Sequence, residues 1–338
     1  MKLKLFLSSL FIVISAGIAS ADDAGLRYIN TRGTIRCGVP SSNKFWAYKD
    51  EKENLQGIGV EICRLISTAV FGRGDRVSIL TLPQAMVDKA FAKNKIDVMI
   101  GGLPFSATNE ISTRAAPIDV IYYEPLVFLA QKGEKAKSMK YFEGEKVCLV
   151  KDDDTEKRLQ AYNNRYDLKL KFMPFVSFSQ AKEAFFLNRC RLVFGSYNTL
   201  KNLEENNPSK IDIEVLPEQV DFVPVYLFAD RENLTLRSIL KWVMNAPKLA
   251  EELDINQQNY NEYLTSKDPV ITNLLGTEPK LWKAFGLTPD WVQIILREHG
   301  NYGEIFRSSL GKKSPFKIKR ELNNLQKNNG LITSVPFL

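Results

Sequence analysis

Apolar and polar positions follow one another in a regular order along the chain, and a short buried strand lies at the centre of that order. Residues 96–100 form an apolar run between the charged Lys95 and the pair Gly101-Gly102, a pattern that predicts a fully buried strand. Paired glycines at the end of a strand let a backbone or a ligand come close to the main chain. The Ser/Thr-rich loop that follows, up to Glu110, is therefore a candidate ligand site, and a plain turn out of the strand is the competing interpretation.

Strand and helix periods alternate around this strand. Residues 34–39 place apolar side chains at every second position, whereas residues 59–71 place them at helical spacing and end before Gly72. A strand–helix–strand–helix–strand order predicts a parallel sheet covered by helices. The predicted elements of this first unit are strands at 34–39, 77–82 and 96–100 and helices at 59–71 and 84–93.

The same order occurs a second time. Residues 94–102 and 188–196, which contain the third strand of each unit, match in their pattern of apolar and polar positions. Two similar α/β lobes with facing strand ends imply a cleft between them. The predicted elements of the second unit are strands at 146–150, 168–173 and 191–195 and helices at 155–162 and 178–188.

Two extended segments are expected to connect the lobes. Residues 126–131 and 221–229 would cross between them, so that residues 132–222 form lobe 2 as an insertion into lobe 1, which comprises residues 22–131 and 223–338. Two crossings favour closure about a hinge over free tumbling. The predicted fold is α/β, with two lobes whose parallel-core sheets carry helices on both faces.

From about residue 233 the pattern is helical to the end of the chain, which predicts a helical C-terminal extension of lobe 1. Thr288 and Pro289 are expected to begin one helix that Gly300 ends, and residues 314–330 are expected to form another. Four aromatic residues of this region are expected to pack in the core, namely Trp282, Trp291, Tyr302 and Phe306.

The first residues indicate export. A basic start, an apolar segment from Leu5 to Ile18 and the small residues 19–21 are typical of a secretory signal peptide cleaved after Ala21. The apolar segment is short for a membrane span, and the sequence has no later candidate. We therefore expect a soluble mature protein that begins at Asp22.

Composition narrows the possible partners. The chain has 46 Lys and Arg against 39 Asp and Glu residues, a net charge of +7 that falls to +5 without Lys2 and Lys4. This excess is dispersed, and no basic run alternates with aromatic residues, so nucleic acid is not an expected partner. An apolar content of 44% over this length suffices for two lobes with separate cores.

Four cysteines in an exported chain predict two disulfides, Cys37 with Cys63 inside lobe 1 and Cys148 with Cys190 inside lobe 2. Each is expected to stabilise its lobe by roughly 3–4 kcal/mol on the loop-entropy model. The sequence has no Cys-x-x-Cys pair and no Cys/His cluster, so we expect neither a metal site nor a cofactor. The single histidine, His299, is expected at the surface in the last turn of a helix, which leaves histidine-based catalysis almost without candidates.

Short motifs along the chain are shared with one known family. They are Arg36-Cys37-Gly38-Val39, Ile62-Cys63-Arg64, Lys95-Ile96-Asp97-Val98, Tyr122-Tyr123, Asn188-Arg189-Cys190, Trp242-Val243-Met244-Asn245-Ala246 and, most specific, Gly300-Asn301-Tyr302-Gly303-Glu304-Ile305-Phe306 with Ser314-Pro315-Phe316-Lys317-Ile318. With these motifs nearly the whole mature chain resembles the periplasmic solute-binding proteins of polar amino-acid ABC importers, in particular the general L-amino-acid-binding branch of bacterial extracellular solute-binding protein family 3. The resemblance implies the type II periplasmic-binding-protein fold, a periplasmic monomer, a small-molecule ligand (an amino acid or a related amine) and delivery to an ABC permease in the inner membrane.

The ligand site departs from the pattern of that family at three places. Relatives place an arginine, which takes the ligand's α-carboxylate, where this chain has Asn109. In lobe 2 they hold the α-ammonium with an aspartate where this chain has Ser196, and their Ser-Gly-Thr-Thr loop is replaced by residues 151–155 (Lys-Asp-Asp-Asp-Thr). Loss of one partner of a buried charge pair typically costs about 2–5 kcal/mol, and asparagine does not replace a bidentate guanidinium.

These departures predict an altered ligand. The acidic residues 152–154 would repel an anionic group and attract a cationic one, although such a run is usually a solvated turn that caps a helix. Arg114 is a further candidate to supply the missing guanidinium. The expected ligand-binding residues are Trp46, Gly102, Leu103, Pro104, Asn109, Asp153, Asp154, Thr155 and Ser196.

The expected function is that of the solute-binding component of an amino-acid-type ABC transporter, which captures a small ligand between two lobes and delivers it to the permease. The alternative is a sensor or interaction module that has lost amino-acid binding and has no role in transport. An enzyme on the same fold, such as a dehydratase of a small acid, is not expected because the cleft lacks histidine and a nucleophile–base pair.

Overall fold

The computed structural model describes residues 24–41, 45–103, 106–132, 138–151, 153–207, 209, 211–277 and 282–337. The expected signal peptide at residues 1–21 lies outside the described residues, as does Pro104.

One eight-stranded sheet runs through the molecule in the order β4-β1-β5-β10-β6-β9-β7-β8. β1 is parallel to β4 and β5, and β7 is parallel to β8 and β9, so each end of the sheet has the expected parallel core. β10 and β6 lie between these cores and are antiparallel to each other and to their outer neighbours. The strands of the sheet are β1 (Ile35–Pro40), β4 (Val77–Leu82), β5 (Val98–Ile100), β6 (Ala115–Gln131), β7 (Lys146–Val150), β8 (Lys171–Phe175), β9 (Leu192–Ser196) and β10 (Ile213–Asp230).

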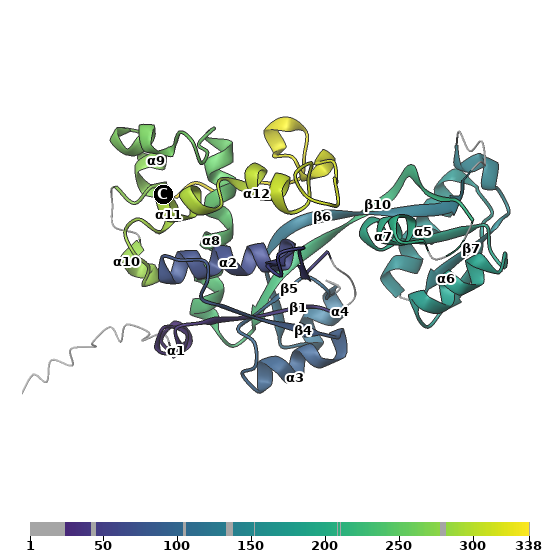
Figure 1. Cartoon of the computed structure of the whole chain (residues 1–338), viewed down its shortest axis with the longest axis horizontal. Coiled ribbons are helices and arrows are strands. Elements are labelled where there is room, and N and C mark those ends of the chain that lie inside the picture. The colour runs from purple at the N-terminus through teal and green to yellow at the C-terminus, as the bar shows by residue number, and fades with distance from the viewer. Residues whose placement is uncertain are drawn as a thin grey trace, which may run out of the picture.

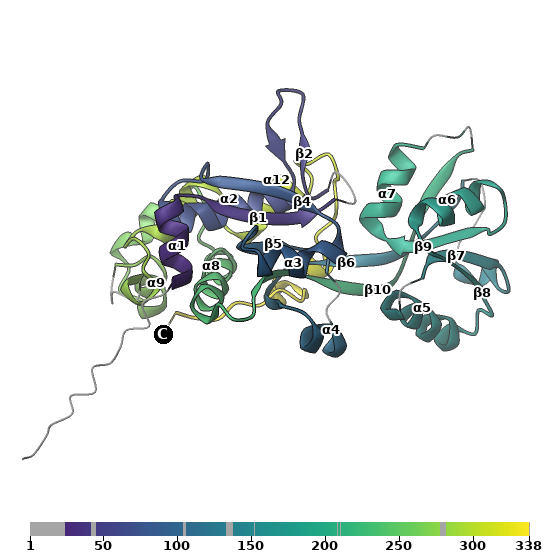
Figure 2. The ribbon, with the colours of Figure 1, turned by 90° about the horizontal axis from the view of Figure 1, so that it is seen from below.

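The long strands β6 and β10 connect two lobes, which confirms the predicted two-lobed fold with two crossings (Figures 1 and 2). The larger lobe contains β1, β4 and β5, the hairpin of β2 (Tyr48–Lys49) and β3 (Leu55–Gln56), and the helices α1 (Ala24–Arg32), α2 (Ile58–Phe71), α3 (Val87–Ala92), α4 (Ala107–Ser112), α8 (Leu234–Glu252), α9 (Pro269–Leu274), α10 (Trp282–Phe285), α11 (Trp291–Glu298) and α12 (Tyr302–Ser309). The smaller lobe contains β7, β8, β9 and the helices α5 (Asp153–Tyr166), α6 (Phe178–Phe186) and α7 (Tyr197–Glu205).

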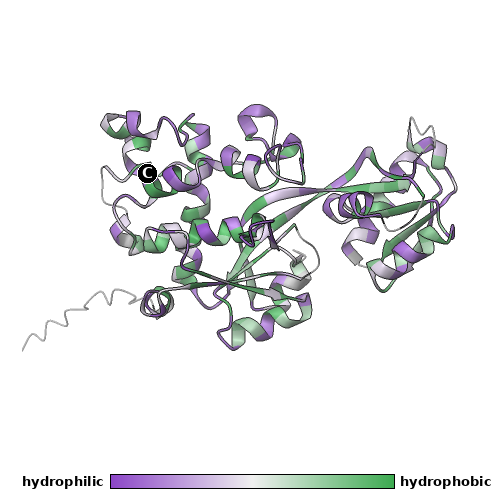
Figure 3. Cartoon of the chain, in the orientation of Figure 1, coloured by the Kyte–Doolittle hydropathy of each residue, from purple (hydrophilic) through white to green (hydrophobic). Residues whose placement is uncertain are grey.

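Both faces of the sheet are covered because successive strand residues point to opposite sides. In β5, Val98 and Ile100 join a core with α2 and α8, whereas Met99 joins a second core with α3. In the smaller lobe, Val147 packs with α5 and Cys148 with α6 and α7. Apolar residues accordingly lie along the strands of both lobes (Figure 3).

The part of β6 in the larger lobe has a strand neighbour on one side only, because β9 pairs with β6 only from Leu126 onward. Side chains from the C-terminal region bind its backbone there. Lys248 Nζ donates to the carbonyl of Val120 at 2.8 Å, and the hydroxyl of Tyr302 donates to the carbonyl of Ile121 at 3.0 Å. The C-terminal region is therefore part of the larger lobe and covers an edge that would otherwise be open.

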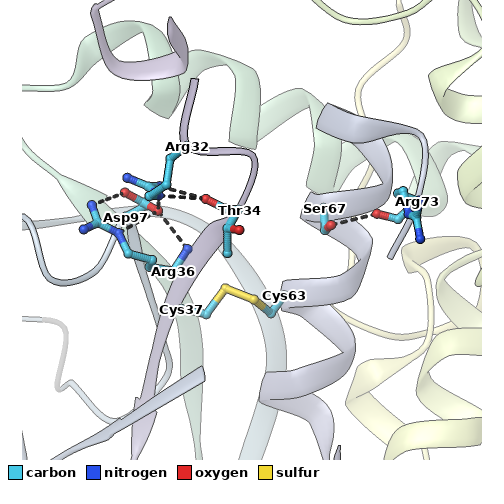
Figure 4. Close-up of a disulfide and its surroundings, with 8 residues drawn as sticks. All are labelled: Arg32, Thr34, Arg36, Cys37, Cys63, Ser67, Arg73 and Asp97. Atoms are coloured by element: carbon cyan, nitrogen blue, oxygen red, sulfur yellow. Dashed lines mark hydrogen bonds and ion pairs between the residues drawn. A yellow bond between two sulfur atoms is a disulfide. The ribbon is translucent and has the colours of Figure 1, made fainter. Parts of the chain in front are cut away.

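Both predicted disulfides are present. Cys37 in β1 is bonded to Cys63 in α2, and Cys148 in β7 is bonded to Cys190 just before β9. Figure 4 shows the first of them beside Asp97, which accepts hydrogen bonds from the backbone N–H of Arg36 at 2.8 Å and from its guanidinium at 2.9 Å. Each bond fastens a helix or loop to the sheet of one lobe.

Three sequence predictions are wrong in detail. The strand expected at 168–173 begins at Lys171, because Lys169 has a φ of 53°, which is not an extended conformation. The helix expected from Thr288 begins at Trp291, after Asp290. Residues 314–330 form no long helix and contain short 3-10 turns at Glu321–Asn323 and Gln326–Asn328, and two of their side chains bind distant strands, Asn323 at Tyr123 and Glu321 at Gln219.

His299 is buried, with a side chain only 7% exposed, so the surface position expected for it is wrong. Its Nδ1 lies 2.8 Å from a carboxylate oxygen of Glu61, and its Nε2 lies 2.8 Å from the hydroxyl of Thr68. An ionised carboxylate only accepts, so Nδ1 donates. The histidine therefore joins the end of α11 to α2, and the four aromatic residues of this region pack in or against the same core as predicted.

Tyr302→Phe should lower the free energy of unfolding by about 1–3 kcal/mol, because it leaves the carbonyl of Ile121 without its donor inside the fold. Tyr302 is 5% exposed, and burial raises the pKa of its hydroxyl, which stays protonated. Urea unfolding measures the change. Tyr28→Phe is the control, since Tyr28 is 69% exposed, and an equal loss in both variants would contradict the role of the Ile121 bond.

Glu61→Gln should lower the free energy of unfolding at neutral pH, and this difference from the native protein should disappear in acid. Burial by itself raises the pKa of Glu61, but the hydrogen bond and charge of His299 outweigh burial and lower it. Because the pKa of Glu61 is lower in the folded state, its ionised form stabilises the fold above the unfolded-state pKa of about 4.3. This stabilisation is lost as the pH falls through the folded-state pKa. Unfolding free energies from pH 7 to 3 should show the gap between the native protein and Glu61→Gln closing in acid. The exposed control Glu51→Gln should show no such convergence.

Candidate functional site

The ends of two parallel-core strands converge on the connection between the lobes. β5 ends at Ile100, opposite Leu227, which in turn pairs with Asp119 of β6. β9 ends at Ser196, opposite Leu126 of β6. β5 is antiparallel to β10, β9 is antiparallel to β6, and β10 and β6 are antiparallel to each other. The carboxyl ends of β5 and β9 therefore point toward each other. Along β6 they are roughly 20 Å apart, at about 3.3 Å per residue. Ligands of open α/β sheets bind at such carboxyl ends.

The end of β5 has room for an indole ring because Gly101 has no side chain. Gly101 and Gly102 have φ angles of 69° and 72°, a left-handed conformation that glycine adopts without strain. A side chain at Gly101 would collide with the ring of Trp46, and one at Gly102 would collide with Pro40. Trp46 is 6% exposed and packs against Tyr122 with ring centroids 6.4 Å apart, so its ring covers the strand end.

A carboxylate from β6 lies at the end of β9. Glu124 accepts hydrogen bonds from the side-chain amide of Asn198 at 2.6 Å and from its backbone N–H at 3.4 Å. The hydroxyl of Ser196, the residue that precedes α7, bonds to that of Thr199 at 2.9 Å, and the hydroxyl of Tyr122 accepts from the side-chain amide of Asn198 at 2.9 Å. Burial raises the pKa of Glu124, and the hydrogen bonds from Ser196, Asn198 and Tyr122 limit that rise.

The first turn of α5 supplies a second acidic position. Asp154 accepts a hydrogen bond from Nε of Arg158 at 3.0 Å, and a terminal nitrogen of the same guanidinium lies 2.6 Å from Asp221 of β10. Both carboxylates line a cavity of about 320 Å³ with Arg158, Lys157 and Arg165. The charge of Asp154 is thus paired inside the protein, and carboxylates in a first turn stabilise a helix.

The remaining expected ligand residues lie at these strand and helix ends. Leu103 is partly buried against the core below α3, Gly102 is exposed, and Thr155 is partly buried in the first turn of α5. The backbones of Asn109 and Asp153 lie in α4 and α5, and the side chains of both are outside the described part of the chain.

Arg114 does not lie near the converging strand ends, and its proposed role as a ligand guanidinium is therefore wrong. It precedes β6, and its guanidinium lies 2.8 Å from Asp230 and 3.1 Å from Glu232. Asp230 pairs with Ala115, at the end of the sheet opposite Gly101. The register of β6 and β10 thus places Arg114 away from the converging ends of β5 and β9.

Sequence reasoning missed Glu124, Asn198 and the pair Arg158–Asp221. Tyr122-Tyr123 is one of the shared motifs, but no spacing shows that the next residue, Glu124, lies beside Ser196, which is 72 positions later in the chain. In the residues that the structure describes, no group of three or more His, Cys, Asp or Glu side chains is placed to hold a metal ion. None of the described helices has both the length and the apolar character needed to cross a membrane.

Comparison with known proteins places this geometry among binding proteins. YhdW of Escherichia coli K12, named as an amino-acid ABC transporter-binding protein, is 28% identical over 98% of this chain and 97% of its own. The general L-amino acid-binding periplasmic protein AapJ of Rhizobium johnstonii is 27% identical over 96% of both chains. An ABC transporter periplasmic binding protein from Brucella ovis with glutathione bound superposes with a TM-score of 0.79 at 26% identity, over 93% of this chain and 99% of that one.

The homologues of this chain are the binding proteins of amino-acid ABC transporters. No family model matches the sequence. ArgBP from T. maritima, in a mutant form, shares the fold with a TM-score of 0.50 at 18% identity over 68% of this chain and 96% of that one. The chain therefore has the type II periplasmic-binding-protein fold predicted from its motifs.

Glu124→Gln should make this homologue of amino-acid-binding proteins relatively more stable as the pH rises. The folded-state pKa of Glu124 is raised, so the ionised form costs stability above that pKa, and the cost disappears as the pH falls toward the unfolded value of about 4.3. Glutamine keeps an acceptor for Asn198 without the charge. Unfolding free energies at pH 4 to 8 measure the difference between the two proteins. A constant difference across this range, as expected for the exposed control Glu183→Gln, would contradict the assignment.

Proposed function

We propose that this protein is the solute-binding component of an amino-acid-type ABC transporter, which captures a small ligand between its lobes and delivers it to a permease. The observation that carries the proposal is the full-length match to the Brucella ovis binding protein, which holds glutathione, together with homologues named for amino-acid transport. The protein works by binding alone. The alternative of a sensor without transport gains no support from these homologues.

Ligand capture requires two bodies that move about β6 and β10. We propose residues 22–131 with 223–338 as lobe 1 and residues 132–222 as lobe 2. Because Leu126–Ala130 of β6 pair with β9, we propose that the connection bends before them, near Tyr123 and Pro224. The antiparallel pairing of β6 and β10 has register shifts on both sides of this point, which supports bending there.

The proposed ligand lies between the ends of β5 and β9. Trp46, Gly102, Leu103, Pro104 and Asn109 contribute from the larger lobe, and Asp153, Asp154, Thr155 and Ser196 from the smaller lobe. The proposed ligand is an amino acid derivative or related amine, since Asn109 lacks the charge that pairs with an α-carboxylate and Glu124 adds a carboxylate beside Ser196.

The proposed location is the periplasm, after cleavage of the signal peptide at Ala21, and the proposed partner is the permease of the inner membrane. The periplasmic relatives and the two disulfides, which persist in an oxidising compartment, support this location. We propose a monomer as the working form.

A ligand screen tests the proposal. Thermal unfolding with a panel of amino acids, polyamines, dipeptides and glutathione should show stabilisation by an amine-bearing ligand other than a free α-amino acid. A ligand at 100 times its Kd stabilises the folded form by about 2.7 kcal/mol, which raises the unfolding temperature measurably. Micromolar binding of ordinary amino acids would contradict the altered site, and no response to any compound would contradict the proposed function.

A matched variant separates the site from the scaffold. Asn109→Arg should raise the affinity for free amino acids by tenfold or more, because a bidentate guanidinium then meets the α-carboxylate. Calorimetry measures the change, with the exposed Glu110→Gln as the control. An unchanged affinity would show that residue 109 does not face the ligand.

A further inference from the structure

We infer that residues 320–323 form a brace by which the C-terminal region controls the relative orientation of the two lobes. The inference deepens the proposed function, since it concerns the hinge on which ligand capture depends. The brace touches both connecting strands, β6 through Asn323 and β10 through Glu321.

Asn323 holds β6 at the hinge. Its side-chain oxygen accepts from the backbone N–H of Tyr123 at 2.6 Å, and its side-chain nitrogen donates to the carbonyl of the same residue at 3.0 Å. The amide thus replaces the neighbouring strand that β6 lacks here. Asn323 is 2% exposed, so this pair of bonds is protected from water.

Arg320 fixes the brace to the larger lobe. Its guanidinium makes two hydrogen bonds to Glu251 of α8, at 2.5 and 3.2 Å, and a third to the carbonyl of Asn323 at 2.9 Å. It also lies 5.4 Å from the ring centroid of Tyr302. Bidentate, partly buried arginine–carboxylate pairs have a defined geometry, so the brace is held as part of this lobe.

Glu321 reaches from the brace to the other lobe. Its carboxylate accepts a hydrogen bond from the side chain of Gln219 at 2.5 Å. Gln219 lies opposite Val127, which also pairs with Gly195 of β9, so Gln219 belongs to the smaller lobe's end of the connection. This bond therefore spans the hinge.

Two further observations support a role for this contact. Glu321 has a φ of 42°, a left-handed conformation that is costly for a non-glycine residue and is retained only where the surroundings impose it. Tyr197, the first residue of α7, packs against the main core of the larger lobe and against a core of the smaller lobe. The lobes are thus in contact beside the hinge, and the brace adds a directional bond to that contact.

A rotation about the hinge must change the distance between Glu321 and Gln219, because the first is fixed to one lobe and the second moves with the other. The bond therefore favours the orientation in which it forms, and a ligand that requires another orientation must break it. Residues far from the ligand in this way set part of its affinity.

Distances between spin labels test the inference without any ligand. Labels are attached through Lys89→Cys in α3 and Glu183→Cys in α6, both exposed and in different lobes. Glu321→Ala and Gln219→Ala should each shift or broaden the distance distribution to the same extent, with a roughly two- to fivefold change in the population of the native distance, typical of one lost hydrogen bond. The double variant should show no further change.

Controls make the outcome decisive. Glu262→Ala removes an exposed charge from the same region and should leave the distribution unchanged, and Glu321→Gln, which keeps an acceptor oxygen, should retain most of the native population. An unchanged distribution in both Glu321→Ala and Gln219→Ala would overturn the inference. Because no ligand is present, failure of the proposed function in the ligand screen would not affect this result.

Discussion

The backbone of β6 must be satisfied along its whole length, and much of the structure follows from that constraint. β6 has β10 on one side throughout, but a second strand neighbour only in the smaller lobe. In the larger lobe, Lys248, Tyr302 and Asn323 bind its backbone instead. Burial lowers the pKa of Lys248, while its ion pair with Asp119 opposes that shift. The helical region that the sequence predicts as an extension of lobe 1 thereby covers the edge of β6 and reaches Tyr123.

Charged side chains lie close to the junction of the two lobes because of this architecture. Glu124 lies at the junction of the lobes, where burial disfavours its charge and the groups around Ser196 stabilise it. Asp154 and Asp221 share Arg158 on the adjacent helix. Carboxylates and cationic side chains thus lie together at the smaller lobe, and the charges of Asp154 and Asp221 are paired with Arg158. In the proposed site a ligand would compete with these internal partners, so its recognition would depend on the arrangement of β6 and β10.

Much of the fold was predictable because periodicity depends on local burial. The apolar run of residues 96–100 predicted β5, the repeat of the pattern predicted two lobes, and the even count of cysteines predicted both disulfides. Boundaries were less predictable, since Leu168 and Leu170 are buried without lying in a strand. His299 was misplaced because helical position alone does not reveal that α2 packs against α11 and offers Glu61 and Thr68.

The sequence by itself determined the order of strands and helices and the paired glycines after β5, because each is a property of neighbouring positions. Only the tertiary structure decided which distant side chains meet. The register of β6 against β9 and β10 places Glu124 beside Ser196. It places Arg114 at the end of the sheet opposite Gly101. The turns after α12 place Asn323 on Tyr123 and Glu321 on Gln219. These contacts depend on long-range strand pairing and packing, which no local pattern encodes.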